Sequence, residues 1–146
     1  MNGKQLWNEF VEKQPEHKNE TYVAWKYGAD TDELADLTMK EIKTATSSAY
    51  ELYVLEKEPL PKKGEWNIIL DSKDQAVCIT RTTDIYVVPF NEVTSDHAFK
   101  EGEGDRSLSY WRAVHKEFYS KAYEENGLGF KETMPVVCEE FELVYK

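Results

Sequence analysis

Residues 75–88, QAVCITRTTDIYVV, are the strongest indication of fold class in this sequence. Its β-branched and aromatic residues are typical of a long β-strand. We expect the strand to bend or bulge near Thr83 and Asp84 and to stop at Pro89, because proline cannot donate a hydrogen bond to a sheet. Its backbone groups need partners elsewhere in the chain.

Three other segments have the character of strands. WNIIL (residues 66–70) is expected to form a strand, and PVVCEEFELVY (residues 135–145) is expected to form the closing strand. SSAYELYVL (residues 47–55) has the period of two that a half-buried strand needs. The alternating residues are Tyr50, Leu52 and Val54 on one face and Ala49, Glu51 and Tyr53 on the other. A loop rich in proline and lysine, residues 56–65, follows it.

Helices are expected over residues 4–14, from Asp30 or Thr31 to about Lys43, over 93–100 and over 106–125. The apolar residues expected to face the core are Leu6, Trp7 and Phe10 in the first helix and Leu108, Trp111, His115, Phe118 and Ala122 in the last. Strands interrupted by helices, without regular βαβ alternation, favour the α+β class with mixed or antiparallel strands. We predict a small β-barrel with helices packed on it, in one domain spanning residues 1–146.

The charge of the chain restricts its partners. With 28 acidic and 18 basic residues the net charge is −10, which argues against long duplex nucleic acid and against an anionic membrane surface. A nucleotide-sized ligand remains open, because one cleft can be locally positive. Cys78 and Cys138 lie in apolar runs without metal-binding spacing. With no signal peptide and no apolar run near the roughly 20 residues of a membrane span, we expect a cytoplasmic protein.

Three stretches together resemble the ASCH domain family, whose fold is PUA-like. They are WKYGADTDELAD (residues 25–36), KTATSSA (residues 43–49) and EGEGDRSLSYWRAVH (residues 101–115). The resemblance covers about residues 20–146 and leaves residues 1–20 as an N-terminal helical extension. It implies a PUA-like β-barrel with a cleft beside the helix that ends at the Lys-Thr motif, and this cleft is the family's proposed site for RNA or a nucleotide.

The resemblance also implies candidate catalytic residues. Some relatives are N4-acylcytidine amidohydrolases and others ribonucleases, and the former combine Lys-x-x-Thr with a Glu four residues after a His. The matching residues are Lys43, Thr46 and Glu101, the last after His97. A threonine hydroxyl needs a base beside it, which a neutral lysine can be, and a glutamate can hold that lysine or shuttle a proton. The amidohydrolase-type relatives are shorter and lack EGEGDRSLSYW. On spacing alone, Lys43 also fits a solvated cation at a helix C-terminus, and Thr46 an ordinary strand residue.

Four other residues are candidates for ligand binding. Trp25 and Tyr27 precede the second helix, where exposed rings can stack on bases. Arg106 and Arg112 can bind a phosphate or a base edge, or can pair with surface carboxylates.

The EGEGD segment raises the question of a metal. The carboxylates Glu101, Glu103 and Asp105 could bind a divalent cation, but the EF-hand spacing is absent. For Glu103 and Asp105 we favour a role at the start of the following helix, where acidic side chains are stabilising. We therefore expect no metal and no other cofactor, with a divalent cation as the alternative.

The hypothesis from the sequence is a protein that recognises a nucleoside, a nucleotide or short single-stranded RNA. Its enzymatic form is a hydrolase that acts on RNA or on an N-acylated nucleoside through Lys43, Thr46 and Glu101. The competing class is a non-catalytic binding module that uses the same cleft. A purely structural interaction domain fits the acidic surface but leaves the KTAT and EGEGD motifs unexplained.

Overall fold

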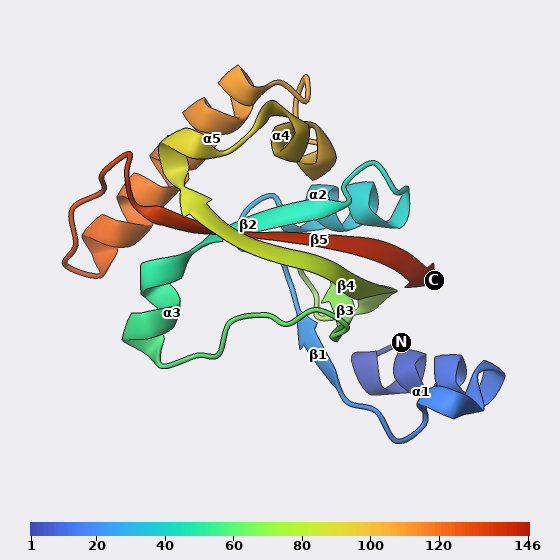
Figure 1. Ribbon diagram of the computed structural model, residues 1–146. Helices are drawn as coiled ribbons and strands as arrows, with labels where there is room; N and C mark the ends of the chain where they lie inside the picture. The colour runs from blue at the N-terminus through green and yellow to red at the C-terminus, as the bar shows by residue number, and fades with distance from the viewer.

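The long strand predicted from residues 75–88 lies at the centre of the sheet (Figure 1). The computed structural model covers residues 1–146 and has five strands in the order β1-β3-β4-β5-β2. Their bounds are Tyr22–Trp25 for β1, Ala45–Ala49 for β2, Trp66–Leu70 for β3, Ala76–Pro89 for β4 and Pro135–Tyr145 for β5. Strand β1 is parallel to β3, and every other neighbouring pair is antiparallel.

The bulge and the end predicted for this strand are confirmed. The register between β4 and β5 shifts between Thr82 and Asp84, and the pairing ends where Pro89 faces Pro135. The α+β class with a mixed sheet is confirmed as well. The edge strands β1 and β2 each pair with a single neighbour, so the sheet is open and its curvature does not close into a complete barrel.

Five helices cover the sheet (Figure 1). Their bounds are Gly3–Lys13 for α1, Thr31–Met39 for α2, Tyr50–Glu56 for α3, Ser95–Glu101 for α4 and Leu108–Glu125 for α5, with short 3-10 turns at Pro15–His17 and Phe90–Glu92. Helix α1 packs Leu6, Trp7 and Phe10 against Trp66, Ile68 and Ile79, as its periodicity predicts. Helices α4 and α5 lie together on β5, and α2 packs on β3 and β4.

One predicted strand is wrong in its second half. Strand β2 ends at Ala49, and the next residues form helix α3. Ala49 pairs with Val136, one residue after β5 begins, so residues beyond Ala49 have no strand to pair with. Their backbone groups are satisfied within a helix instead. Within this helix, Val54 is 62% exposed.

Smaller differences concern the ends and faces of elements. Strand β1 is not among the strands predicted from the sequence. In α5, Trp111 is buried as predicted. Further along the helix Tyr119 and Tyr123 are buried while Phe118 is exposed, so the core-facing residues there are displaced by one position from the prediction. The N-cap of α5 is Ser107, and Asp105, expected at the start of this helix, accepts a hydrogen bond from the Ser107 amide. None of the helices combines the length and the hydropathy that crossing a bilayer would demand.

Candidate functional site

Two of the sequence motifs meet where α4 ends. The Thr44 amide donates to the Lys100 carbonyl at 2.7 Å, which joins the start of β2 to the last turn of α4. Gly102 caps α4 in the left-handed conformation, with φ of 75°. A Cβ atom at Gly102 would lie 2.5 Å from the Ile42 carbonyl oxygen. Only glycine permits this approach, which brings Lys43 beside Glu101.

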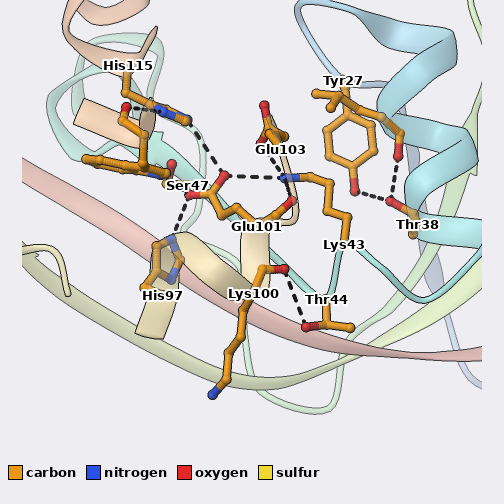
Figure 2. A network of polar contacts seen from close by, with 12 residues as sticks. Tyr27, Thr38, Lys43, Thr44, Ser47, His97, Lys100, Glu101, Glu103 and His115 are labelled. Carbon is orange, nitrogen blue, oxygen red and sulfur yellow. Dashed lines mark hydrogen bonds and ion pairs between the residues drawn. The ribbon is translucent and has the colours of Figure 1, made fainter. Parts of the chain in front are cut away.

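The Lys43 side chain is buried between two carboxylates, with 1% of its surface exposed (Figure 2). Its Nζ lies 3.3 Å from Glu101 Oε1 and 3.0 Å from Glu103 Oε2, and it also donates to the Glu101 carbonyl. The Tyr27 ring centroid is 5.3 Å from the same nitrogen.

The Glu101 carboxylate is the centre of this buried cluster (Figure 2). Its Oε2 lies 2.7 Å from His97 Nε2 and accepts a hydrogen bond from Trp111 Nε1, while Oε1 lies 3.6 Å from His115 Nε2. Burial raises the pKa of Glu101, but the charge of Lys43, the His97 hydrogen bond and the charge of His115 outweigh it and hold that pKa far below its ordinary value. The carboxylate is therefore ionised.

A metal ion would compete with Lys43 in this cluster. Ligand atoms of Glu101, Glu103 and His115 lie within 4.8 Å of one another, a spacing that a divalent cation could use. The Lys43 ammonium, however, already contacts both of these carboxylates. Asp105 is not part of the group, since its carboxylate accepts a hydrogen bond from the Ser107 amide.

A cavity of about 660 Å³ lies across the opening between the two edge strands. Its lining includes Trp25 of β1, Thr46 and Ser48 of β2, and Glu139 of β5, together with α3, the following loop and α5. Thr46 and Glu139 are directly opposite in the β2–β5 pair, so their side chains lie on the same face of the sheet. The Thr46 hydroxyl makes no hydrogen bond within the protein, which leaves it free for a ligand.

A chain of hydrogen bonds connects Trp25 to Glu139 beneath this cavity. Trp25 Nε1 donates to Asn67 Oδ1 at 3.1 Å, and Asn67 Nδ2 donates to Thr82 Oγ1 at 3.0 Å. Thr82 Oγ1 donates in turn to Glu139 Oε2 at 2.8 Å. The bulge in β4 begins at Thr82, and bulges commonly re-aim a side chain beside a functional site.

Glu139 is 7% exposed and has no ion-pair partner. Burial raises the pKa of its carboxyl group, the Thr82 hydrogen bond opposes that rise, and the nearby Glu65 adds to it. Burying a carboxylate without a cation reduces the stability of the folded protein, and such groups are concentrated at functional sites.

The residues singled out from the sequence fall into three places. Trp25 and Thr46 line the cavity. Tyr27 also borders it, but its hydroxyl is hydrogen-bonded to Thr38 and its ring covers Lys43. Lys43 and Glu101 contact each other in the buried cluster and do not line the cavity.

The two arginines lie outside the cavity. Arg106 donates to the carbonyls of Phe99 and Ile42 and stacks on the Phe99 ring, so it holds α4 against the start of β2. Arg112 is exposed on α5 and donates to the Asn91 carbonyl.

Sequence reasoning missed Asn67 and Glu139. One signal for Glu139 was available, because PVVCEEFELVY carries two consecutive glutamates inside an apolar strand. Alternation places one of them on the inner face. No local pattern distinguishes Asn67 from the apolar residues of WNIIL around it.

The model of the ASCH domain family matches residues 23–145. The chain therefore belongs to the ASCH domain family, which is associated with binding of RNA and nucleotides.

Two solved structures support the same assignment. An ASCH domain from Lactobacillus crispatus JV V101 is 28% identical, with a TM-score of 0.92 over 98% of this chain and 94% of that one. A protein from Enterococcus faecalis V583, assigned to the family DUF984, is 33% identical, with a TM-score of 0.85 over 97% of this chain and 87% of that one. The predicted PUA-like fold class is thus confirmed. No protein of curated function matches the chain.

Proposed function

We propose that this ASCH protein binds a nucleobase, as part of a nucleoside, a nucleotide or single-stranded RNA, in the cavity beside Trp25 and Thr46. The observation that carries the proposal is the fixed position of Trp25. Its indole ring is half-buried at the cavity wall and held by the hydrogen bond to Asn67. A ring held in this way is a ready platform for base stacking, which is insensitive to sequence.

The size and polarity of the cavity fit a base. A volume of about 660 Å³ lies in the range of small-molecule sites, roughly 300–1,000 Å³. The charged residues that line it are the glutamates Glu56, Glu58, Glu65 and Glu139 and the lysines Lys26 and Lys62. An interior with more carboxylates than ammonium groups disfavours a phosphate, so the base enters while phosphates remain outside. Bases in a long duplex are stacked and paired, so such a duplex is a poor ligand.

Replacing Trp25 by alanine tests this proposal. We expect the affinity for a mononucleoside or a short oligoribonucleotide to fall about 5- to 150-fold, because stacking on an aromatic ring contributes about 1–3 kcal/mol per base. Isothermal titration calorimetry measures the change. Tyr110→Ala is the matched control, since Tyr110 is 39% exposed and lies outside the cavity. A wild-type protein that binds no nucleoside and no short RNA would refute the proposed function.

Hydrolysis of the bound ligand is the second candidate. It is favoured by one observation, the contact of 3.3 Å between Lys43 and Glu101, two of the residues that match the amidohydrolase-type relatives. Thr46, the third, lines the cavity. Because Lys43 is paired with two carboxylates, it would have to lose a proton before it could act as a base.

The threonine hydroxyl separates the two candidates. If the protein is a hydrolase, Thr46→Val should lower turnover of acylated nucleosides or short RNA by at least about a hundredfold while binding persists. Turnover is followed by chromatography of the products, with and without divalent metal. A wild-type protein that binds these ligands and leaves all of them intact would exclude hydrolysis and leave the binding function.

A further inference from the structure

Glu139 faces the cavity as a hydrogen-bond acceptor that the protein itself does not fully use. Its Oε2 accepts from Thr82, while Oε1 has no hydrogen-bond donor and no cation within the chain. Its neighbour Glu140 differs in this respect, since Glu140 pairs with Lys100 at 2.9 Å and does not line the cavity. Of two adjacent glutamates on β5, only the inward one is left without a cation.

The hydrogen-bond chain has a fixed direction. The indole nitrogen of Trp25 can only donate a hydrogen bond, so Asn67 must accept that bond with Oδ1. Asn67 Nδ2 then donates to Thr82. The Thr82 hydroxyl accepts that bond, and its single hydrogen goes to Glu139. The hydrogen of the Thr82 hydroxyl is thereby used, and Glu139 Oε1 accepts no hydrogen bond within the protein and is left for a donor from a ligand or from water.

Thr46 supplies the complementary group. It lies opposite Glu139 across β2 and β5, on the same face, and its hydroxyl is unpaired within the protein. Together the two side chains present an acceptor and a hydroxyl donor side by side. The amino group and the adjacent ring nitrogen of cytosine or adenine present the matching donor and acceptor.

We propose that Glu139 selects the base in this cavity by accepting a hydrogen bond from its amino group, with the Thr46 hydroxyl on the adjacent ring nitrogen. The site therefore prefers cytosine or adenine to uracil or hypoxanthine, which carry an oxo group in place of the amino group. This specificity rests on the proposed function, since it requires that a base bind in the cavity at all.

The test compares two matched pairs of ligands, cytidine with uridine and adenosine with inosine, by calorimetry at neutral pH. We expect wild-type protein to bind the amino member of at least one pair about tenfold or more tightly than its oxo counterpart. E139Q keeps the shape and the bond from Thr82 but turns a donor toward the ligand, so the preference should disappear or reverse. E140Q, on the outward neighbour, should retain the wild-type preference.

The possible outcomes distinguish the role of Glu139 in base selection from the proposed binding of a base in the cavity. Equal affinities within both pairs would overturn the role of Glu139 but not nucleoside binding. A wild-type preference for uridine and inosine, which a protonated Glu139 would produce, would overturn it in the same way. An E139Q protein that keeps the wild-type preference would overturn it as well. Failure of all four nucleosides and of short RNA to bind would instead refute the proposed function itself.

Discussion

Replacing Lys43 by methionine should destabilise the protein by about 3–5 kcal/mol, the cost of removing one partner from a buried ion pair. Methionine keeps much of the apolar stem and removes only the charge. Glu101 would then remain ionised in a site where 1% of the residue is exposed, without the cation 3.3 Å away. Glu103 would lose its partner as well.

Chemical unfolding in urea measures this loss. Lys40→Met is the matched control, because Lys40 pairs with Asp36 at 2.7 Å but its side chain is 58% exposed. Exposed pairs contribute about 0–1 kcal/mol, so the control should be nearly neutral. Adding Glu101→Gln to Lys43→Met should recover part of the stability, since it removes the uncompensated charge. A loss below about 1 kcal/mol for Lys43→Met would contradict this account of the cluster.

The pH dependence of the Lys43→Met effect has a definite sign. The pKa of Glu101 is lowered in the folded protein, so its ion pair stabilises the fold above the unfolded pKa of about 4.3 and loses that contribution as the pH falls toward the folded value. The difference between wild type and Lys43→Met should therefore be full at neutral pH and should shrink on acidification below about pH 4.3.

Gly102→Ala should destabilise the protein by about 2–5 kcal/mol. A left-handed conformation costs a non-glycine residue about 1–2 kcal/mol, and Gly102 has φ of 75°. The new Cβ would also meet the Ile42 carbonyl at 2.5 Å, and relieving such overpacking costs about 1–3 kcal/mol more. Because the contact is to backbone, the relief must move residues 42–44 away from α4.

Comparison with Gly127→Ala isolates the cost of the close approach to Ile42. Gly127 has φ of 73°, but a Cβ there would meet nothing within 4 Å, so only the conformational cost remains. Urea unfolding of the two variants should show Gly102→Ala as the more destabilised one by at least about 1 kcal/mol. Equal losses would mean that the close approach to Ile42 does not matter for stability.

The helix α1 and the strand β4 illustrate what local pattern predicts well. Leu6, Trp7 and Phe10 recur at helical spacing and are buried as expected. The β-branched run that ends at Pro89 forms the central strand, with its bulge in the predicted place. In both segments the spacing of the apolar side chains is itself periodic, so the secondary structure can be predicted without knowing which other segments pack against them.

The segment SSAYELYVL shows where local pattern fails. Its alternation fits a strand throughout, yet residues from Tyr50 onward are helical. Strand pairing is a property of two segments, and β5 offers no partner beyond Ala49. Propensity for a strand has no effect on a backbone that has nothing to pair with.

For the candidate site, local motifs were enough to identify the family and the residues Lys43 and Glu101, which the fold brings into contact. The three-dimensional arrangement was needed to show that these two residues form a buried charge cluster and that Thr46 and Glu139 line one cavity. The physical reason is that burial and hydrogen-bond direction depend on what packs from other strands and helices. The chain from Trp25 through Asn67 and Thr82 to Glu139 joins four strand positions that no sequence spacing relates.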